Sequence, residues 1–364
     1  MPELLVPPRY DGPGVASIVP ALLDAIDATW LPAPVHDARS VVVLVIDGLG
    51  FDTLDSHATA LAQLRALEGS RVTTVVPSTT ASALTSITTG LAPSEHGLVG
   101  YRMRVDGAVL NTLSWQSDGR KPPDPSIVQR HAPFRGRSIP VVTKSEFHRS
   151  GFTEAHLRGG RFHGWRASSS LVEQCRVLVA AGEPLIYAYY PGVDEVAHAH
   201  GLHDGFYEAE LAFTDRLVGD LLHVLPGDTA LLVTADHGQV HLDPEAWVDI
   251  EELADLVDAC AGDARFRYLY ARRGAGADLL DAARAAYGER AWVRSRDEVI
   301  ADGWLGPPPA VPVRRRLGDV VLAAHAGTAF IDPALPREAR LRSGHGSLTE
   351  SEMWVPLVAA RGVA

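Results

Sequence analysis

The stretch SVVVLVIDGLG at residues 40–50 places six consecutive apolar residues, five of them β-branched, directly before an Asp-Gly pair. Two further stretches have the same form, EPLIYAYYPGVDEVAHAHG at 183–201 and DTALLVTADHGQV at 228–240. Continuous apolar runs without alternation are typical of strands that are buried on both faces. Helix-like segments such as residues 207–225 lie between them. This order predicts an α/β fold with a central, mostly parallel sheet flanked by helices.

Residues 246–334 have a different pattern from the rest of the chain. FRYLYARRG is typical of a strand, ADLLDAARAAYG of a helix, and PPPAVPVRRRLGD of a proline-rich connection. We therefore expect a small inserted α+β cap at 246–334. The catalytic core would consist of residues 1–245 and a closing segment at 335–364.

The composition restricts the classes of partner. The chain has 364 residues and a net charge of -12, so it repels polyanions, and we expect no nucleic acid polymer as a partner. Its two cysteines, Cys175 and Cys260, match no disulfide framework, which favours a reducing, cytoplasmic compartment. The first residues do not resemble a signal peptide, and no run approaches the ~20 apolar residues of a membrane helix. We therefore expect no membrane partner; the oligomeric state is not indicated.

Acidic and imidazole side chains follow the three apolar runs. Because open α/β sheets bind ligands at the carboxyl ends of their strands, these side chains predict a common site. Mixed Asp and His ligands suit zinc or manganese better than magnesium or calcium, and six of them suit two ions with open positions. The six candidates are Asp47, Asp194, His198, Asp236, His237 and His345.

The spacing of these residues supports a shared site, although each alone has a simpler interpretation. Asp194 and His198 are four residues apart, so a helical turn places both on one face. Taken singly, Asp47 and Asp194 would be turn or helix-capping residues, and His198 a surface histidine. The set is more specific than its members.

The stretch VPSTTASALTSITTG at 76–90 has eight hydroxyl side chains in fifteen positions. Ser78 or Thr79 could cap a helix through the following residues, and a hydroxyl in its first turn would face free backbone amides. Such a hydroxyl beside two cations could act as a nucleophile in phosphoryl transfer. The alternative is a purely capping role. The pattern alone does not choose between Thr79 and Thr80.

Five motifs occur in the order seen in the alkaline phosphatase superfamily: VIDGLG, PSTTASALTSITTGLAPSEHGLVGY, PGVDEVAHAHG, TADHG and SGHGS. The set looks most like the type I phosphodiesterase/nucleotide pyrophosphatase branch, over residues 40–101, 183–240 and 326–360. The resemblance implies an alkaline-phosphatase-like fold. It also implies a hydrolase that cleaves phosphodiester or nucleotide pyrophosphate bonds at a two-zinc site, through a phospho-threonine intermediate.

The resemblance also implies a role for each residue. The nucleophile of the family lies ten residues before the glycine of a Thr-Gly element, here Gly90, which maps it to Thr80. The amide of Ala81 would bind a phosphate oxygen. The resemblance divides the metal ligands into one set of Asp194, His198 and His345 and a second set of Asp47, Asp236, His237 and Thr80.

Two positions depart from the family pattern. Ala83 stands where many members carry an Asn that contacts phosphate, and Tyr101 stands where another Asn often follows the His-Gly element. Lys144, in a segment that resembles the substrate-binding lysine segment of phosphonoacetate hydrolases, is a candidate replacement. The alternative functions are therefore a phosphomonoesterase or phosphonate hydrolase with the same metals and, in another class, a non-catalytic binding protein stabilised by metal. A small anionic phosphate ester is the expected substrate of either enzyme.

Overall fold

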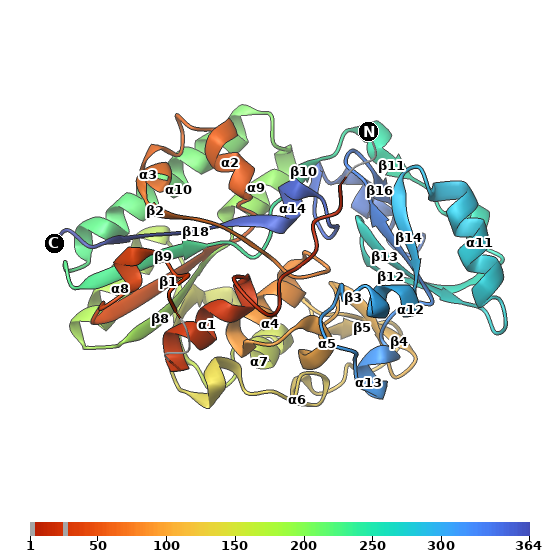
Figure 1. Cartoon of the computed structure of the whole chain (residues 1–364), viewed down its shortest axis with the longest axis horizontal. Coiled ribbons are helices and arrows are strands. Elements are labelled where there is room, and N and C mark those ends of the chain that lie inside the picture. The colour runs from red at the N-terminus through yellow and green to blue at the C-terminus, as the bar shows by residue number, and fades with distance from the viewer. Residues whose placement is uncertain (1–3, 25–27) are drawn as a thin grey trace.

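The computed structural model describes residues 4–24 and 28–364 (Figure 1). Its main sheet has seven strands in the order β2-β18-β9-β1-β8-β6-β7. All neighbours are parallel except at β18, which is antiparallel to both β9 and β2. The predicted mostly parallel α/β sheet is confirmed. The strands are β1 (Ser40–Ile46), β2 (Glu68–Thr73), β6 (Pro140–Lys144), β7 (Arg161–Trp165), β8 (Leu185–Tyr190), β9 (Thr229–Thr234) and β18 (Trp354–Arg361).

The three apolar runs form the centre of this sheet. Every residue of β1, β8 and β9 is buried, as expected for strands covered on both faces. In the register, Ile46 lies beside Tyr190, and Val45 lies beside Thr234. Because the three strands are parallel neighbours, the loops that follow them open at one edge of the sheet.

Helices cover both faces of the main sheet (Figure 1). On one face, α4 packs against α1 and α7; on the other, α10 packs against α3, α8 and α9. The helices are α1 (Val15–Asp24), α2 (Phe51–Ser56), α3 (Ala62–Ala66), α4 (Thr80–Thr89), α5 (Pro93–His96), α6 (Pro125–Val128), α7 (Gly151–His156), α8 (Ser168–Ala180), α9 (Gly192–His200), α10 (Gly205–Val224) and α14 (Glu350–Met353). None of the helices in the described part of the chain is long and apolar enough to cross a bilayer.

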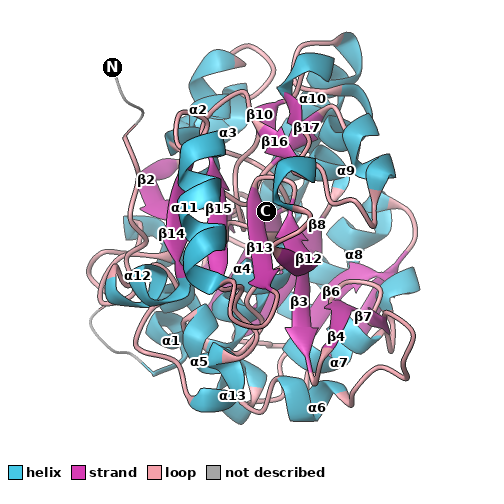
Figure 2. Cartoon of the chain, turned by 90° about the vertical axis from the view of Figure 1, so that its right-hand side faces the viewer, coloured by secondary structure: helices cyan, strands magenta, loops and turns pink. Residues whose placement is uncertain are grey.

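A second, antiparallel sheet lies to the right of the main sheet in Figure 1 and faces the viewer in Figure 2. Its order is β12-β13-β15-β14, with β12 (Val257–Asp263), β13 (Phe266–Ala271), β14 (Ala291–Ser295) and β15 (Val320–Ala324). Helix α11 (Gly276–Tyr287) packs its Leu279 and Tyr287 into a small core on one face. On the other face, Phe266 and Tyr268 join the main core. The division into a core and a cap at 246–334 stays a prediction.

Smaller elements complete the surroundings of the site. A three-stranded sheet of β3 (Arg102–Val105), β4 (Ala108–Asn111) and β5 (Gln116–Ser117) follows α5. Two short pairs join β10 (Val240–His241) to β17 (Ser343–Gly344) and β11 (Trp247–Val248) to β16 (Ala329–Phe330). Helices α12 (Arg296–Ala301) and α13 (Val311–Arg314) lie between β14 and β15 in the sequence.

A buried ion pair connects the β12–β13 turn to the closing segment of the chain. Arg265 donates from Nε to Oε1 of Glu352 at 2.7 Å and from Nη2 to Oε2 at 2.8 Å, and both side chains are fully buried. The Glu352 carboxylate also accepts the backbone N–H of Ser347, close to His345. The pair therefore holds the histidine loop against the second sheet.

We expect Glu352→Ala to lower the free energy of unfolding by about 3–5 kcal/mol, because it leaves the Arg265 guanidinium buried and unpaired. Urea unfolding followed by circular dichroism measures the change. The matched control is Asp228→Ala, which breaks an exposed ion pair with Arg39 and should shift the midpoint little. Equal midpoints for Glu352→Ala and the wild type would contradict the role given to this pair.

Candidate functional site

The carboxyl edge of the main sheet brings all six predicted ligands together in two groups. The first group is Asp194, His198 and His345, and the second is Asp47, Asp236 and His237; within each group, one atom per residue lies within 4.8 Å of the others. Asp194 and His198 meet because helix α9 places residues four apart on one face, with Nε2 of His198 3.3 Å from Oδ1 of Asp194.

The buried carboxylates each leave one oxygen without a hydrogen bond. Oδ2 of Asp47 accepts from the Tyr189 hydroxyl, whereas its Oδ1 has no partner. Oδ1 of Asp236 accepts from the amides of Gly48 and His237, whereas its Oδ2 has none. Oδ1 of Asp194 is likewise buried and unpartnered. Buried polar atoms are almost always satisfied, so three orphaned oxygens at one place point to a missing cationic partner.

The three imidazoles are oriented in the same way as one another. Nδ1 of His198, His237 and His345 lies 3.1, 3.1 and 3.0 Å from the carbonyl oxygens of Ser343, Gly238 and Ser78. A carbonyl oxygen only accepts, so each Nδ1 carries the proton and each Nε2 keeps its lone pair. Holding an imidazole by its Nδ1–H is how proteins orient histidine ligands toward a metal.

The pKa shifts of the site residues favour the protonation states that metal ligands need, provided that a cation is present beside the carboxylates. Burial raises the pKa of Asp47 well above its usual range, and the nearby Asp236 and Asp194 carboxylates raise it further. Burial also raises the pKa of Asp194 and Asp236. Burial lowers the pKa of His237 and, together with the neighbouring histidines, holds the pKa of His345 well below its usual range. These histidines are therefore neutral, while the carboxylates lack a counter-charge.

Distances between the candidate ligand atoms fit the size of a transition-metal site. Nε2 of His237 is 3.3 Å from Oδ1 of Asp47 and 3.6 Å from Oδ2 of Asp236, the two orphaned oxygens. Nε2 of His345 is 3.8 Å from Oδ1 of Asp194. Ligands at about 2.0–2.1 Å from a tetrahedral ion lie about 3.4 Å apart. The residues present thus fit two divalent ions with nitrogen and oxygen ligands.

Thr80 lies beside the second group. It is the first residue of α4, it is 8% exposed, and its Oγ1 is 3.2 Å from Nε2 of His237. Thr79, the neighbouring candidate, is the N-cap residue, and its hydroxyl bonds to Asp263 instead. Of these two candidates, only the Thr80 hydroxyl contacts one of the six predicted ligands; its role as the nucleophile stays a prediction.

The start of α4 offers backbone donors next to this hydroxyl. The first amides of a helix have no intrahelical acceptor, and the Thr79 side chain does not cap them. The amide of Ala81 is one of these free donors, at the positive end of a ten-residue helix dipole. An anionic oxygen at this position would meet these donors, and the contact of the Ala81 amide with a phosphate oxygen stays a prediction.

Two recesses meet at Thr80. The apolar recess has a volume of about 220 Å³ and is lined mainly by apolar side chains, among them Leu84, Phe147, Phe152 and Tyr189, together with Asp47, Asp194 and Glu195. The acidic recess has a volume of about 260 Å³ and is lined by Asp263, Glu338, Tyr101 and Leu341, together with Asp194, His198 and His345. A substrate with two arms has space on both sides of the hydroxyl.

The remaining predicted positions lie at different distances from the site. Lys144 ends β6, and its ammonium is 2.5 Å from Oε1 of Glu195 and 3.8 Å from Oε1 of Glu146. It lines neither recess at Thr80, and its role as a substrate contact stays a prediction.

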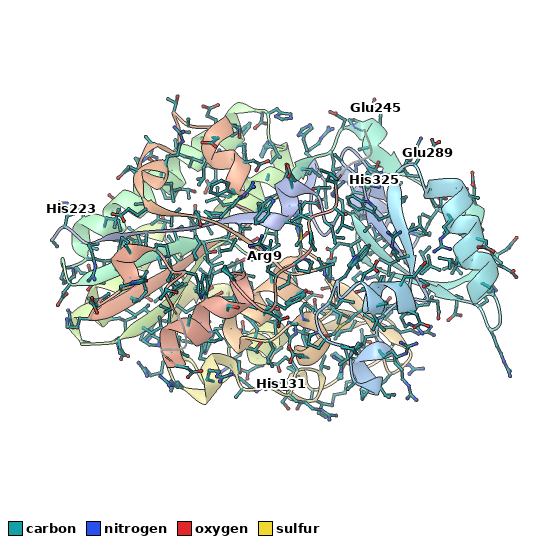
Figure 3. All side chains as sticks on the ribbon, in the orientation of Figure 1. Arg9, His131, His223, Glu245, Glu289 and His325 are labelled. Carbon is teal, nitrogen blue, oxygen red and sulfur yellow. The ribbon has the colours of Figure 1, made fainter. Side chains whose placement is uncertain are left out.

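Ala83 is fully buried within α4, whereas Tyr101 lines the acidic recess and its hydroxyl accepts from Asn111. His131 and His223 are exposed and lie at the periphery (Figure 3).

Two residues of the site were not identified from the sequence. Tyr189 donates to Asp47 from within strand β8, and no local signal distinguishes it from the other apolar residues of that run. Asp263 is the last residue of β12 and lines the acidic recess, 27 residues after Asp236 in the sequence. No local pattern distinguishes it from an ordinary turn residue.

Comparisons with known proteins identify the family of the chain and structures with the same fold. The sequence model of the type I phosphodiesterase / nucleotide pyrophosphatase family matches residues 41–348. No curated protein matches the chain. Among solved structures, murine ectonucleotide pyrophosphatase / phosphodiesterase 5 superposes with a TM-score of 0.65 at 16% identity, covering 88% of this chain and 87% of that one. An inactive variant of the murine protein in complex with AMP gives the same values.

A second kind of neighbour has the same fold. Phosphonoacetate hydrolase from Sinorhizobium meliloti 1021, in complex with phosphonoacetate, has a TM-score of 0.63 at 17% identity. The match covers 89% of this chain and 91% of that chain. Identities this low establish a common fold, and the family match over most of the chain establishes descent. The chain belongs to the type I phosphodiesterase / nucleotide pyrophosphatase family of the alkaline phosphatase superfamily, and it is a phosphoric ester hydrolase.

Proposed function

We propose that this protein is a metal-dependent phosphodiesterase that uses Thr80 as its nucleophile. The observation that carries the proposal is the position of the Thr80 hydroxyl, 3.2 Å from Nε2 of His237 and beside three buried carboxylate oxygens without partners. A metal site that only stabilised a binding protein would have no use for a hydroxyl at the start of a helix that points free amides toward the same place.

Two divalent ions would be held by the two groups of ligands. Asp194, His198 and His345 would hold one ion, and Asp47, Asp236, His237 and Thr80 the other. Bound there, the ions supply Lewis-acid stabilisation of the charge on the attacking and leaving oxygens. The mixture of Asp and His favours Zn²⁺, with Mn²⁺ as the alternative.

The residues of the chain then act in two steps. Oγ1 of Thr80 forms a bond to phosphorus as the bond from phosphorus to the leaving alcohol oxygen breaks, and the Thr80 proton ends on that alcohol. In-line displacement places the leaving oxygen opposite Thr80, toward the group of Asp194, His198 and His345. The amide of Ala81 donates to a non-bridging oxygen. Water then cleaves the phospho-threonine bond and restores the hydroxyl.

The charges around Thr80 favour a diester over a monoester or a phosphonate. A diester carries one negative charge, whereas phosphomonoesters and many phosphonates carry about two at neutral pH. The one lysine predicted to assist is paired with Glu195 and lines neither recess. The lining of the acidic recess adds carboxylates rather than cations. An extra charge on the phosphoryl group would therefore meet repulsion and no further counter-charge.

A paired assay tests this preference. We expect zinc-loaded protein to hydrolyse bis(p-nitrophenyl) phosphate with a kcat/KM at least about tenfold above that for p-nitrophenyl phosphate, which corresponds to ~1.4 kcal/mol of differential transition-state stabilisation. Both reactions release p-nitrophenolate, so one absorbance readout serves for both. Preference for the monoester would favour the phosphomonoesterase alternative. A phosphonoacetate arm tests the phosphonate alternative, and turnover of none of the three would favour the non-catalytic one.

A further inference from the structure

A basic cavity lies outside the site at Thr80 and shares no residue with either of its recesses. Its volume is about 670 Å³, which exceeds that of both recesses and is typical of small-molecule sites. The β3–β4 turn and α6 form one side, and β13, α12 and the segment from α13 to β15 form the other. Helices α6 and α13 lie at the bottom of Figures 1 and 2. Five arginines line the cavity: Arg104, Arg130, Arg296, Arg315 and Arg316.

The carboxylates of the lining do not balance these arginines. Its acidic residues are Asp106 and Asp319. Asp319 is already engaged, because its Oδ1 accepts from Nη2 of Arg296 at 2.7 Å and its Oδ2 accepts from the amide of Ala271 at 2.8 Å. Asp106 is an exposed residue in the β3–β4 turn. The lining therefore carries an excess of positive charge, although the chain as a whole has a net charge of -12.

Three of the five arginines lack a carboxylate partner. Arg296 has Asp319, and Arg104 is 2.9 Å from Oδ2 of Asp258, outside the lining. Within residues 4–24 and 28–364, the other three, Arg130, Arg315 and Arg316, form no ion pair. They come from two segments that are far apart in the sequence, one after α6 and one after α13. Bringing like charges together costs free energy, and an anion between them would remove that cost.

Arg316 distinguishes this cavity from a group of solvated surface arginines. Its side chain is 8% exposed, and its Nη1 is fixed by donating to the carbonyl oxygens of Gly97 at 2.6 Å and Val128 at 3.0 Å. Its Nε and Nη2 have no hydrogen-bond partner in the described part of the chain. Burial lowers the pKa of Arg316 to about 10; the charge of Asp106 opposes this effect, and that of Arg130 adds to it. A buried, immobilised cation thus lines the cavity with free donors and no counter-charge.

We propose that this cavity is a second binding site, that its ligand is a small molecule with two or more negative charges on phosphate groups, and that Arg130, Arg315 and Arg316 bind it. A guanidinium presents a planar fork of N–H donors that matches two oxygens of a phosphate, so several arginines can share the oxygens of one phosphate group. Tyr270 and Ile127 give the cavity an apolar wall for the carbon part of such a molecule. The inference is independent of the proposed phosphodiesterase activity.

A series of ligands with increasing charge tests the proposal. Fructose, fructose 6-phosphate and fructose 1,6-bisphosphate share one sugar, and each phosphate group adds about two negative charges at neutral pH. Isothermal titration calorimetry of the zinc-loaded protein measures their binding. We expect the Kd to fall along the series, and Arg130→Gln/Arg315→Gln to raise the Kd for the bisphosphate by about tenfold or more. Arg316 is left in place, because its bonds to Gly97 and Val128 belong to the fold.

The matched control is Arg216→Gln/Arg273→Gln, which removes the same charge from two exposed residues outside the cavity and should keep the Kd of the wild type. Modification of arginines by phenylglyoxal, mapped by peptide mass spectrometry, locates the ligand. The bisphosphate should slow the modification of Arg130 and Arg315 and leave that of Arg216 and Arg273 unchanged.

Three results would overturn the inference: no binding of the bisphosphate by the wild type, equal affinity for fructose and the bisphosphate, or the same Kd for the wild type and Arg130→Gln/Arg315→Gln. A phosphate that binds only at the metal groups gives the third result and protects neither arginine of the cavity, so it counts against the second site. The hydrolysis of bis(p-nitrophenyl) phosphate is measured separately, and the proposed function stands or fails on that assay alone.

Discussion

Replacing Thr80 with alanine is expected to lower kcat for bis(p-nitrophenyl) phosphate by at least about a thousandfold. Its hydroxyl lies 3.2 Å from Nε2 of His237, the ring nitrogen that is left free to bind a metal. The substitution removes the proposed nucleophile and leaves the six ligands and the free amides of α4 unchanged. What residual hydrolysis remains would come from water attacking a phosphate that is still bound.

The control lies in the same helix. Thr89, at the other end of α4, is 4% exposed and donates to the Thr85 carbonyl at 2.6 Å. Thr89→Ala removes the same atoms from a buried threonine that is remote from both recesses, and it should keep kcat within about twofold of the wild type. Rapid quenching and mass spectrometry should detect one phosphoryl group on wild-type protein and none on Thr80→Ala. Full activity of Thr80→Ala would remove the nucleophile assignment.

Removing divalent metal is expected to abolish turnover and to lower the midpoint of thermal unfolding together. Without cations, Oδ1 of Asp47, Oδ2 of Asp236 and Oδ1 of Asp194 are buried with no partner, which costs folding free energy. An ion that binds only the folded protein stabilises it by about 4 kcal/mol per site at a thousand times its Kd. Dialysis against a chelator, followed by titration with Zn²⁺, should reverse both changes. Differential scanning fluorimetry measures the stability independently of activity.

The metal content of the same samples gives the number of ions bound per chain. We expect two equivalents of Zn²⁺ per chain by elemental analysis, and one equivalent for Asp236→Asn, which removes a ligand charge from the second group only. Asp243→Asn, at an exposed carboxylate near the site, is the matched control and should bind two. An identical melting midpoint before and after chelation, with activity retained, would show that the two groups hold no metal.

The sequence predicted the main sheet and the cluster of ligands because both depend on local rules. Burial on both faces requires uninterrupted apolar residues, and β1, β8 and β9 show this pattern directly. Parallel strands end at one edge, so residues that follow such runs meet there, as Asp47 and Asp236 do. Helical periodicity placed Asp194 beside His198 in the same way. None of these inferences required knowing which strands are neighbours in the sheet.

Only the tertiary structure decided which residues surround that cluster. Lys144 and Asp263 both end strands, yet Lys144 is paired with Glu195, whereas Asp263 accepts from the Tyr101 amide and lines the acidic recess. Likewise, β18 lies antiparallel between β9 and β2, although its sequence resembles that of a parallel core strand. The apolar pattern of a strand and the residues that follow it are properties of a short segment, so they can be predicted from the local sequence. The partner of each charged residue near the site is set by contacts between distant segments, 51 residues apart for Lys144 and Glu195, and no segment contains that information alone.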